Sequence, residues 1–270
     1  MKTAFSTLAC PDLELREVLS LAARNGMDAV EIRLDRENRL CGYTLEEAEA
    51  VKRLIAERGI AISDLATGIH FHGEKVPLEA VAYCSRLAAA LGVPALRVFA
   101  DAPVRAGSEI PKDFVFRNAA ALSECADLAA CHGVALWVET HSAYSTGERL
   151  VPLLEAANRE NIRVICDIMH SIEFGEAPAR TVSLLGDQIV HVHLKDGVPP
   201  AGTEDVHYVL CALGEGAVSF AEIANALSTV SYDGYLSLEW ELMWHPELAA
   251  CYESSDALLA AYRELLARYF

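Results

Sequence analysis

The chain has 270 residues, of which 53% are hydrophobic and 23% charged, so it can bury a substantial core as a globular protein. Its formal net charge of -17 argues against a nucleic-acid partner, because binding a phosphate backbone needs a basic face. No apolar stretch is long enough to cross a bilayer, and the segment from Met1 to Ala9 is too weakly apolar for a signal peptide, so we expect no membrane association.

The eight cysteines form no C-x-x-C pair, and most lie in helical or strand patterns beside alanines. This distribution is typical of small buried side chains in a reducing compartment, rather than of disulfides or a zinc–thiolate site. We therefore expect free cysteines and a cytoplasmic protein.

Eight short apolar runs have the length and β-branched content of buried strands. In chain order they are Thr3–Leu8, Ala29–Leu34, Ile60–Ala66, Ala95–Ala100, Ala135–Thr140, Arg163–Asp167, Ile189–Leu194 and Tyr235–Trp240. Helical patterns separate them, and such an alternation of strands and helices predicts a parallel sheet.

The ends of the helical patterns support this division of the chain. Glycine and, less often, asparagine accept the left-handed conformation that closes a helix. Such residues stand at Gly26, Gly59, Gly92, Gly133, Asn161, Gly186 and Gly234. Capping boxes mark three helix starts, Thr44 with Glu47, Ser145 with Glu148 and Ser219 with Glu222, and a final amphipathic helix begins near Ser255.

Eight strand–helix units in this length favour closure into a single (β/α)₈ TIM barrel. The alternative is a doubly wound open sheet, which usually has a glycine-rich turn after its first strand. Leu8-Ala-Cys-Pro-Asp12 is not such a turn. No linker or low-complexity stretch interrupts the pattern, so we expect one domain over residues 1–270.

Four consecutive strands, from the fifth to the eighth, end in groups that bind hard metal ions. These groups are Glu139, Asp167, His193 and Glu239. In a barrel of this kind the active site lies at the carboxyl ends of the strands, where such groups converge. Buried carboxylates are costly unless they are paired, protonated or bound to a cation, so a divalent metal site is predicted. The alternative is pairing with Arg33, Arg97 and Lys195 without a metal.

These residues resemble a known family. Glu139, the Asp167-x-x-His170 motif, His191-x-His193-Leu-Lys-Asp and Glu239 are similar to the xylose isomerase-like barrel superfamily, especially its sugar phosphate isomerase/epimerase members. The segments Leu-Gly-Glu-Gly216 and Ser-Leu-Glu239-Trp-Glu-Leu-Met-Trp-His-Pro246 fit the same group.

The resemblance implies one divalent ion held by Glu139, Asp167, His193 and Glu239. Three oxygen donors and one imidazole suit Mn²⁺ first, with Mg²⁺, Co²⁺ or Zn²⁺ as the other candidates. It also implies an isomerase or epimerase that moves a proton next to a metal-bound carbonyl of a small sugar, sugar phosphate or related polyol. Glu139 and Glu239 would exchange the proton, and His170 would hold a substrate hydroxyl.

Two departures from the epimerase pattern keep other activities open. Ketose 3-epimerases carry an arginine a few residues past the histidine of the seventh strand, where this chain has Lys195-Asp196-Gly-Val-Pro-Pro. They also carry a further glutamate after the fifth strand, where this chain has His141-Ser-Ala-Tyr. His141 and Lys195 also resemble the 3-dehydroshikimate dehydratases of the superfamily, and inosose dehydration uses similar logic. In a dehydratase, His141 and His170 would be the acid and base, because imidazole titrates near neutral pH. A non-catalytic sugar-binding barrel is the third alternative.

Four residues are candidate substrate contacts, and each has a structural alternative. His70 ends the third strand or caps a helix, and Arg97 binds an anionic substrate group or pairs with Glu31 or Glu139. Lys195 follows the metal-site histidine, and His207 lies in the long loop after the seventh strand or on the surface. The substrate and the oligomeric state stay open, although homodimers and homotetramers are common among such barrels.

Overall fold

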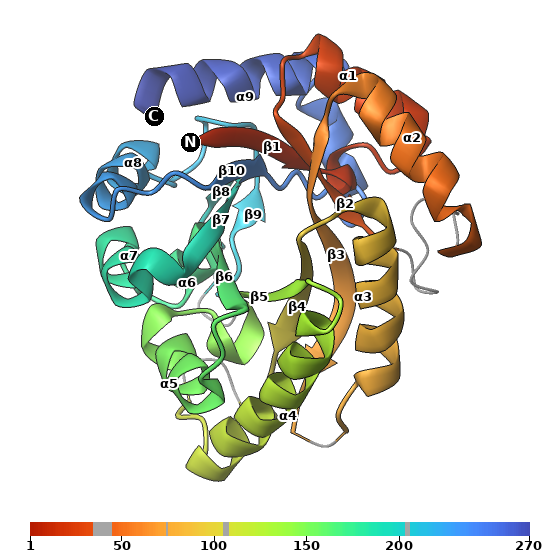
Figure 1. Cartoon of the computed structure of the whole chain (residues 1–270). Helices are drawn as coiled ribbons and strands as arrows, with labels where there is room; N and C mark the ends of the chain where they lie inside the picture. Colours follow the sequence, from red (N-terminus) through yellow and green to blue (C-terminus); the bar gives the residue numbers. More distant parts are fainter. Residues whose placement is uncertain (35–44, 74, 105–107, 203–205) are drawn as a thin grey trace.

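The computed structural model describes residues 1–34, 45–73, 75–104, 108–202 and 206–270. Eight parallel strands close into a barrel, and helices cover its outer face (Figure 1). The barrel strands are β1 (Lys2–Ser6), β2 (Ala29–Arg33), β3 (Ala61–Phe71), β4 (Ala95–Ala100), β5 (Ala135–Glu139), β6 (Ile162–Asp167), β7 (Ile189–Leu194) and β10 (Tyr235–Leu238). Each strand lies beside its neighbours in this order, and β10 closes the ring against β1. The predicted single (β/α)₈ TIM barrel is confirmed.

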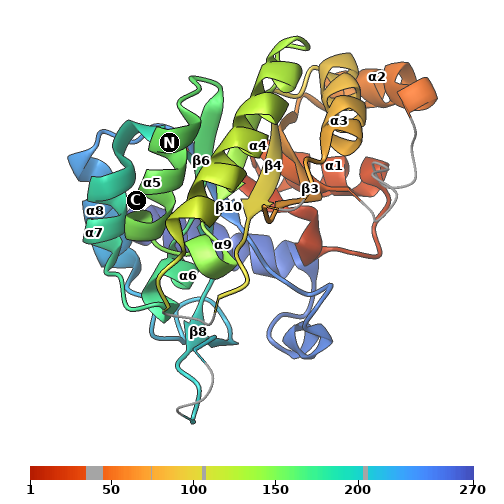
Figure 2. The ribbon, with the colours of Figure 1, turned by 90° about the horizontal axis from the view of Figure 1, so that it is seen from below.

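The helices follow the predicted alternation, with two of them between β6 and β7. They are α1 (Leu15–Arg24), α2 (Ala48–Arg58), α3 (Leu78–Leu91), α4 (Lys112–Ala130), α5 (Gly147–Ala157), α6 (Ile168–Glu173), α7 (Pro178–Leu185), α8 (Phe220–Thr229) and α9 (Ser255–Tyr269). In the loop after β7, β8 (Gly197–Val198) and β9 (Val209–Leu210) form a small antiparallel pair, which Figure 2 shows on the lower side of the molecule.

Three strand ends differ from the predicted ones by two residues or more. The last strand stops at Leu238 rather than at Trp240. The first strand stops at Ser6, because Thr7–Ala9 forms a 3₁₀ turn and the Ser6 hydroxyl accepts a hydrogen bond from the Leu8 N–H at 3.5 Å. The third strand continues past Ala66 to Phe71, so His70 is part of the strand rather than of the loop that follows it.

The helix ends were predicted in part. Gly26, Gly59, Gly92, Gly133 and Gly186 all have positive φ. The helix before β6, however, ends at Asn158 with φ 46°, not at Asn161. Before β10 the left-handed residue is Ser231 with φ 52°, whereas Gly234 is needed for another reason. A Cβ on Gly234 would overlap the Val190 carbonyl oxygen of the neighbouring β7.

One of the three predicted capping boxes is confirmed as a cap. The Ser219 hydroxyl accepts the Glu222 N–H at the start of α8. The prediction for Ser145 is wrong, because α5 begins at Gly147 and its first N–H groups donate to Glu176 from a distant loop. Thr44 lies outside the described residues.

The apolar residues form two separate clusters. The larger fills the space between the strands and the helices and includes the inner stripe of α9, as predicted. The smaller contains Ala95, Trp137 and Ile165, with Ala135 and Val190 packed against it, and lies on the inward faces of the strands. Polar side chains occupy the interior toward the strand ends, so the barrel presents a polar site above an apolar base.

All seven cysteines of the described residues are free, as predicted; Cys41 lies outside that part of the chain. Among the described helices, none has both the length and the apolar character that a membrane span requires.

Candidate metal centre

The four predicted ligands come together at the carboxyl ends of their strands. Glu139 and Asp167 are the last residues of β5 and β6, His193 lies near the end of β7, and Glu239 directly follows β10. Their exposed fractions are between 0% and 4%. Each offers one ligand atom, and these atoms lie within 4.8 Å of one another. The convergence expected from four consecutive strand ends is therefore present.

His193 connects the four predicted ligands, called the cage below, to a fourth carboxylate, Glu31. Its Nδ1 faces the cage, 3.4 Å from Glu239 Oε2, 3.8 Å from Asp167 Oδ2 and 3.9 Å from Glu139 Oε1. Its Nε2 lies 2.7 Å from Glu31 Oε2. A neutral imidazole that donates its Nε2–H to Glu31 presents the Nδ1 lone pair to the cage, which is the form that binds a metal ion.

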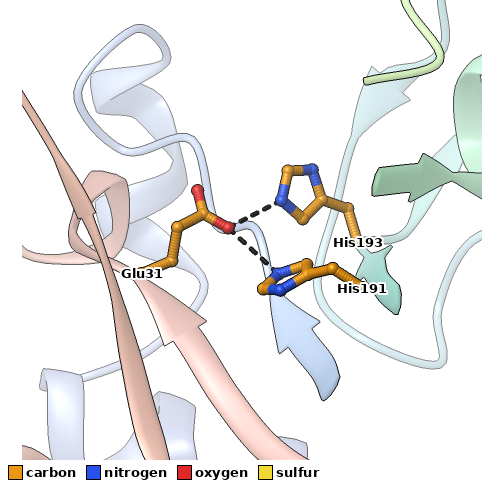
Figure 3. Close-up of side chains that lie close together, drawn as sticks. All are labelled: Glu31, His191 and His193. Atoms are coloured by element: carbon orange, nitrogen blue, oxygen red, sulfur yellow. Dashed lines mark hydrogen bonds and ion pairs between the residues drawn. The ribbon is translucent and has the colours of Figure 1, made fainter. Parts of the chain in front are cut away.

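Figure 3 shows Glu31 reaching from β2 toward both histidines of β7. Glu31 Oε2 is 3.1 Å from His191 Nε2, and His191 Nδ1 is 3.8 Å from Asp64 Oδ1. All these side chains are fully buried. Burial and then the charge of Glu31 raise the pKa of Asp64 to about 6. The pKa of Glu31 lies well below its usual range, because His193 and His191 outweigh the effect of burial.

Two cations neutralise part of the cage. Arg97 Nη1 on β4 is 3.0 Å from Glu139 Oε2 and 3.7 Å from Glu239 Oε1. Lys195 Nζ is 2.8 Å from both Asp167 Oδ2 and Glu239 Oε2, and 2.6 Å from Glu241 Oε1. Arg97 and Lys195 thus form the ion pairs with the predicted ligands that the sequence allowed as an alternative. Arg97 pairs with Glu139 rather than with Glu31.

These pairs do not balance the charge. Five carboxylates gather around the predicted ligands, namely Glu31, Glu139, Asp167, Glu239 and Glu241. Among the described residues, Arg97 and Lys195 are the arginine and lysine side chains that form ion pairs with members of this group. Burial lowers the pKa of His193, but Glu239 and Glu31 together raise it well above its usual value. Even with a protonated His193, the five carboxylates outnumber the cations that pair with them. The buried Nδ1 of His193 makes no hydrogen bond in the described structure. Both observations fit a site built for a divalent cation.

His141 and His170, called the histidine wall below, flank the cage. His170 follows Asp167 on α6, with its Nδ1 2.9 Å from Glu173 Oε2 and its Nε2 3.6 Å from Asp167 Oδ2. The rings of His141 and His170 meet edge to face, with centroids 5.0 Å apart. Burial and the neighbouring His170 lower the pKa of His141 to about 2, so this imidazole is neutral.

The remaining predicted contacts lie farther out. His207 is 59% exposed, and its Nδ1 is 3.1 Å from Glu173 Oε2. It lines a pocket of about 390 Å³ together with His141 and His170. His70 stacks on Phe99 with centroids 4.7 Å apart and lines a larger cavity of about 960 Å³. His70 and His207 therefore border two different cavities.

The sequence interpretation named Glu31 only as a possible partner of Arg97 and did not assign it, Asp64 or Glu173 to the site. A carboxylate inside the apolar strand Ala-Val-Glu31-Ile-Arg was the available signal for the first of them. For Glu173 the signal was the helical spacing Asp167-x-x-His170-x-x-Glu173, which places the three residues along one side of a short helix.

Asp196 has a structural role that the strand-end pattern concealed. Its Oδ1 accepts the N–H groups of Gly197 and Val218, at 2.9 and 3.3 Å. Its Oδ2 accepts those of Gly214 and Gly216, at 2.8 and 3.1 Å. This buried carboxylate holds the base of the loop after β7, next to Lys195, and explains the Leu-Gly-Glu-Gly216 segment.

The comparisons with known proteins agree with this architecture. A family model described as a xylose isomerase-like TIM barrel matches residues 19–261. The chain belongs to this family. An uncharacterised protein of Methanocaldococcus jannaschii, MJ1311, is 29% identical over 140 residues, which cover 49% of this chain and 45% of that protein. The match thus spans less than half the length of this curated relative.

Several solved structures share the fold over nearly the whole chain. The probable 3-DHS dehydratase AsbF from Bacillus anthracis has a TM-score of 0.75 at 18% identity, covering 98% of this chain and 99% of its own. A D-allulose 3-epimerase from Methylomonas sp., in complex with D-allulose, has a TM-score of 0.76 at 20% identity and covers 100% of this chain and 97% of its own. The IOLI protein with a binding zinc atom has a TM-score of 0.76 at 17% identity and covers 100% of this chain and 99% of its own. At these identities the likeness establishes the fold, which serves both epimerases and a dehydratase.

Proposed function

We propose that the chain is a divalent-metal-dependent isomerase or epimerase acting on a small polyhydroxy carbonyl compound. One observation carries the proposal: four buried ligand atoms from adjacent strands lie within 4.8 Å, with His193 Nδ1 aimed at three carboxylates. Glu139, Asp167, His193 and Glu239 would hold the ion. This donor set favours Mn²⁺, with Mg²⁺, Co²⁺ and Zn²⁺ as alternatives.

An ion in this cage would polarise a substrate carbonyl and so ease removal of a proton from the neighbouring carbon. Glu139 and Glu239 would carry the proton. They belong to β5 and to the end of β10, which β6 and β7 separate in the barrel, so they approach a substrate from different sides. Arg97 Nη1 lies close to both carboxylates and fixes their orientation, while Lys195 donates to Glu239.

The metal assignment is tested by elemental analysis of protein loaded with Mn²⁺. The wild-type chain should hold about one ion, and alanine at any one ligand, for example Asp167→Ala, should lower the occupancy sharply. Unchanged occupancy in all four single alanine variants would sink the ligand set.

The reaction is tested by incubating keto sugars and cyclitols with the Mn²⁺-loaded chain in D₂O. An isomerase or epimerase incorporates solvent deuterium at one carbon and loses no water. Loss of a general acid or base typically slows a reaction on the order of a hundredfold to ten-thousandfold. Glu139→Gln and Glu239→Gln should each cause such a loss while retaining part of the metal, because the amide oxygen remains a weak ligand.

Dehydration is the second candidate, and the histidine wall favours it. The rings of His141 and His170 lie in contact, and His170 Nε2 is 3.6 Å from Asp167 Oδ2, so both imidazoles lie beside the predicted metal ligands. In this reaction the substrate would lose water after the same proton abstraction. If His141→Asn and His170→Asn abolish turnover while Glu239→Gln retains proton exchange, the dehydratase replaces the epimerase.

A further inference from the structure

Arg33 is the third arginine or lysine side chain at the mouth, and its position differs from those of Arg97 and Lys195. It is the last residue of β2, two positions after Glu31. Alternate residues of a strand share a face, so Arg33 lies on the same inward face as Glu31, one layer nearer the opening. Its backbone is fixed there by a hydrogen bond from its N–H to Thr7 Oγ1 at 2.9 Å.

Among the described residues, no carboxylate lies within ion-pair distance of Arg33, although the more distant charges of Glu139, Glu239 and Glu31 act on it. Arg97 and Lys195 each pair with carboxylates of the cage, whereas no described carboxylate forms an ion pair with Arg33. The guanidinium instead lies over the ring of Trp244, 5.5 Å from its centroid. Burial and the like charge of Arg97 lower its pKa more than Glu139, Glu239 and Glu31 raise it. A half-buried cation that contacts no carboxylate directly is costly to retain, so an anionic ligand would relieve this cost.

The cavity in front of Arg33 has room for such a ligand. Its volume is about 960 Å³, and its described lining combines Arg33 and His70 with apolar surface from Leu34, Ile69 and Trp244. Small-molecule sites commonly join an apolar wall to a few oriented polar groups. Asp12 and Glu14 also line this cavity and would repel a highly charged anion. A single guanidinium matches the two oxygens of one carboxylate, so a monoanion suits this lining better than a phosphate dianion.

We propose that Arg33 is a carboxylate-binding residue, and that the substrate is a polyhydroxy keto acid rather than a neutral sugar. This inference rests on the proposed function, since the cage would hold the carbonyl end of the same molecule. The carboxylate would lie against the guanidinium and the apolar surface beside Trp244, and the hydroxyl-bearing carbons would extend toward Glu139 and Glu239, whose charges act on Arg33.

Two matched ligands test the proposal by isothermal titration calorimetry on the Mn²⁺-loaded full chain. 5-Keto-D-gluconate and L-sorbose share one ketol and differ by a carboxylate in place of a hydroxymethyl group. Wild-type protein should bind the acid at least about tenfold more tightly, which is the lower range for a charge-assisted hydrogen bond. Arg33→Gln should remove this preference and leave the affinity for L-sorbose within about twofold. Arg33→Lys should keep part of the preference. The control Arg86→Gln removes an equal charge from the outer face of α3 and should change neither affinity.

The outcomes separate this site from the proposed reaction. A preference for the acid that persists in Arg33→Gln, or that is absent in the wild type, overturns the proposal. A stronger Arg33-dependent preference for D-fructose 6-phosphate over D-fructose overturns the choice of carboxylate. Arg33-dependent binding of the acid without any exchange of substrate protons in D₂O supports the anion site and contradicts the proposed isomerase.

Discussion

His193 is the residue on which the proposed metal site depends, because its two nitrogens face different carboxylates. Nδ1 faces the cage, while Nε2 lies 2.7 Å from Glu31. Acceptors behind a ligating histidine fix its tautomer and orientation, and their loss typically weakens metal binding 10–100-fold, roughly. The buried Glu31 is therefore as much part of the proposed site as the four predicted ligands.

Glu31→Gln is accordingly expected to weaken Mn²⁺ binding by roughly 10–100-fold. The amide keeps the volume of the side chain but no longer supplies a charged acceptor to the Nε2–H. A competition titration with a chelating dye measures the change. Glu264→Gln, an equal change at an exposed position of α9, is the control and should bind Mn²⁺ like the wild type. Equal affinities for the two variants would contradict the role of Glu31.

Asp64 gives a prediction about pH. Burial and Glu31 raise its folded pKa to about 6, whereas an unfolded aspartate titrates near about 3.9. Between about pH 4 and pH 6 the folded state binds more protons at Asp64 than the unfolded state does. The contribution of Asp64 to the free energy of unfolding therefore falls as the pH rises through this range. Asp64→Asn removes this titration. Urea unfolding of chelator-treated protein should show the variant more stable than wild type above about pH 6, with the difference shrinking toward about pH 4.

The exposed control Asp187→Asn should follow the wild type at every pH. An Asp64→Asn variant that is no more stable than wild type above about pH 6 would show that the folded pKa of Asp64 is not raised above its unfolded value.

At the scale of single residues, the sequence predicted the location of those side chains whose position along a strand determines where they point. Glu139, Asp167 and Glu239 stand at strand ends and converge as expected. Glu31 and Asp64 could not be assigned in the same way, because their partners His193 and His191 are more than a hundred residues away in sequence. Only the barrel register brings them into contact.

Among the elements, the loop after β7 depends most on a single side chain. Asp196 is 1% exposed and accepts four backbone N–H groups from Gly197, Gly214, Gly216 and Val218. Gly216 approaches so closely that a Cβ there would overlap the Asp196 carboxylate. The loop start, and with it Lys195, is therefore held by this carboxylate.

Asp196→Ala should lower the free energy of unfolding by on the order of 3 kcal/mol, because several buried N–H groups lose a charged acceptor together. Urea unfolding measures this loss. Asp196→Asn keeps one oxygen acceptor and should lose less, whereas Gly216→Ala should resemble Asp196→Ala by displacing the carboxylate. Wild-type stability in both Asp196→Ala and Gly216→Ala would refute the role of the loop contacts.

The element ends also show where local patterns lose their value. Ser219 was assigned correctly because its acceptor and donor lie within one helical turn. The start of α5 was misassigned because its acceptor, Glu176, comes from a segment beyond β6. A capping signal is readable from sequence spacing only when the cap is local.

For the whole molecule, the fold was predictable because each strand–helix unit repeats the same signals and the closed ring joins sequential neighbours. The excess of carboxylates at the mouth follows from this topology, which directs every strand end toward one region. Lys195 bridges Asp167 and Glu239, and Arg97 pairs with Glu139. His193 Nδ1 has no hydrogen-bond partner in the described structure. Metal-free protein therefore retains like-charge repulsion that a divalent ion would remove.

The final prediction is that this repulsion can be measured as stability. An ion that binds only the folded state at about 100 times its Kd adds about 2.7 kcal/mol to the free energy of unfolding. For a chain of this length each kcal/mol raises Tm by about 2–4 °C, so saturating Mn²⁺ should raise the wild-type Tm by roughly 5–10 °C over chelator-treated protein. Asp167→Asn should lose most of this response, because the site lacks one charged ligand. Without metal the same variant should melt at or above the wild type, since Lys195 keeps Glu239 and Glu241 while one negative charge is gone. Differential scanning calorimetry with Mn²⁺ and with chelator tests both effects in one series. A wild-type Tm that does not respond to Mn²⁺, Mg²⁺, Co²⁺ or Zn²⁺ would refute the proposed metal centre.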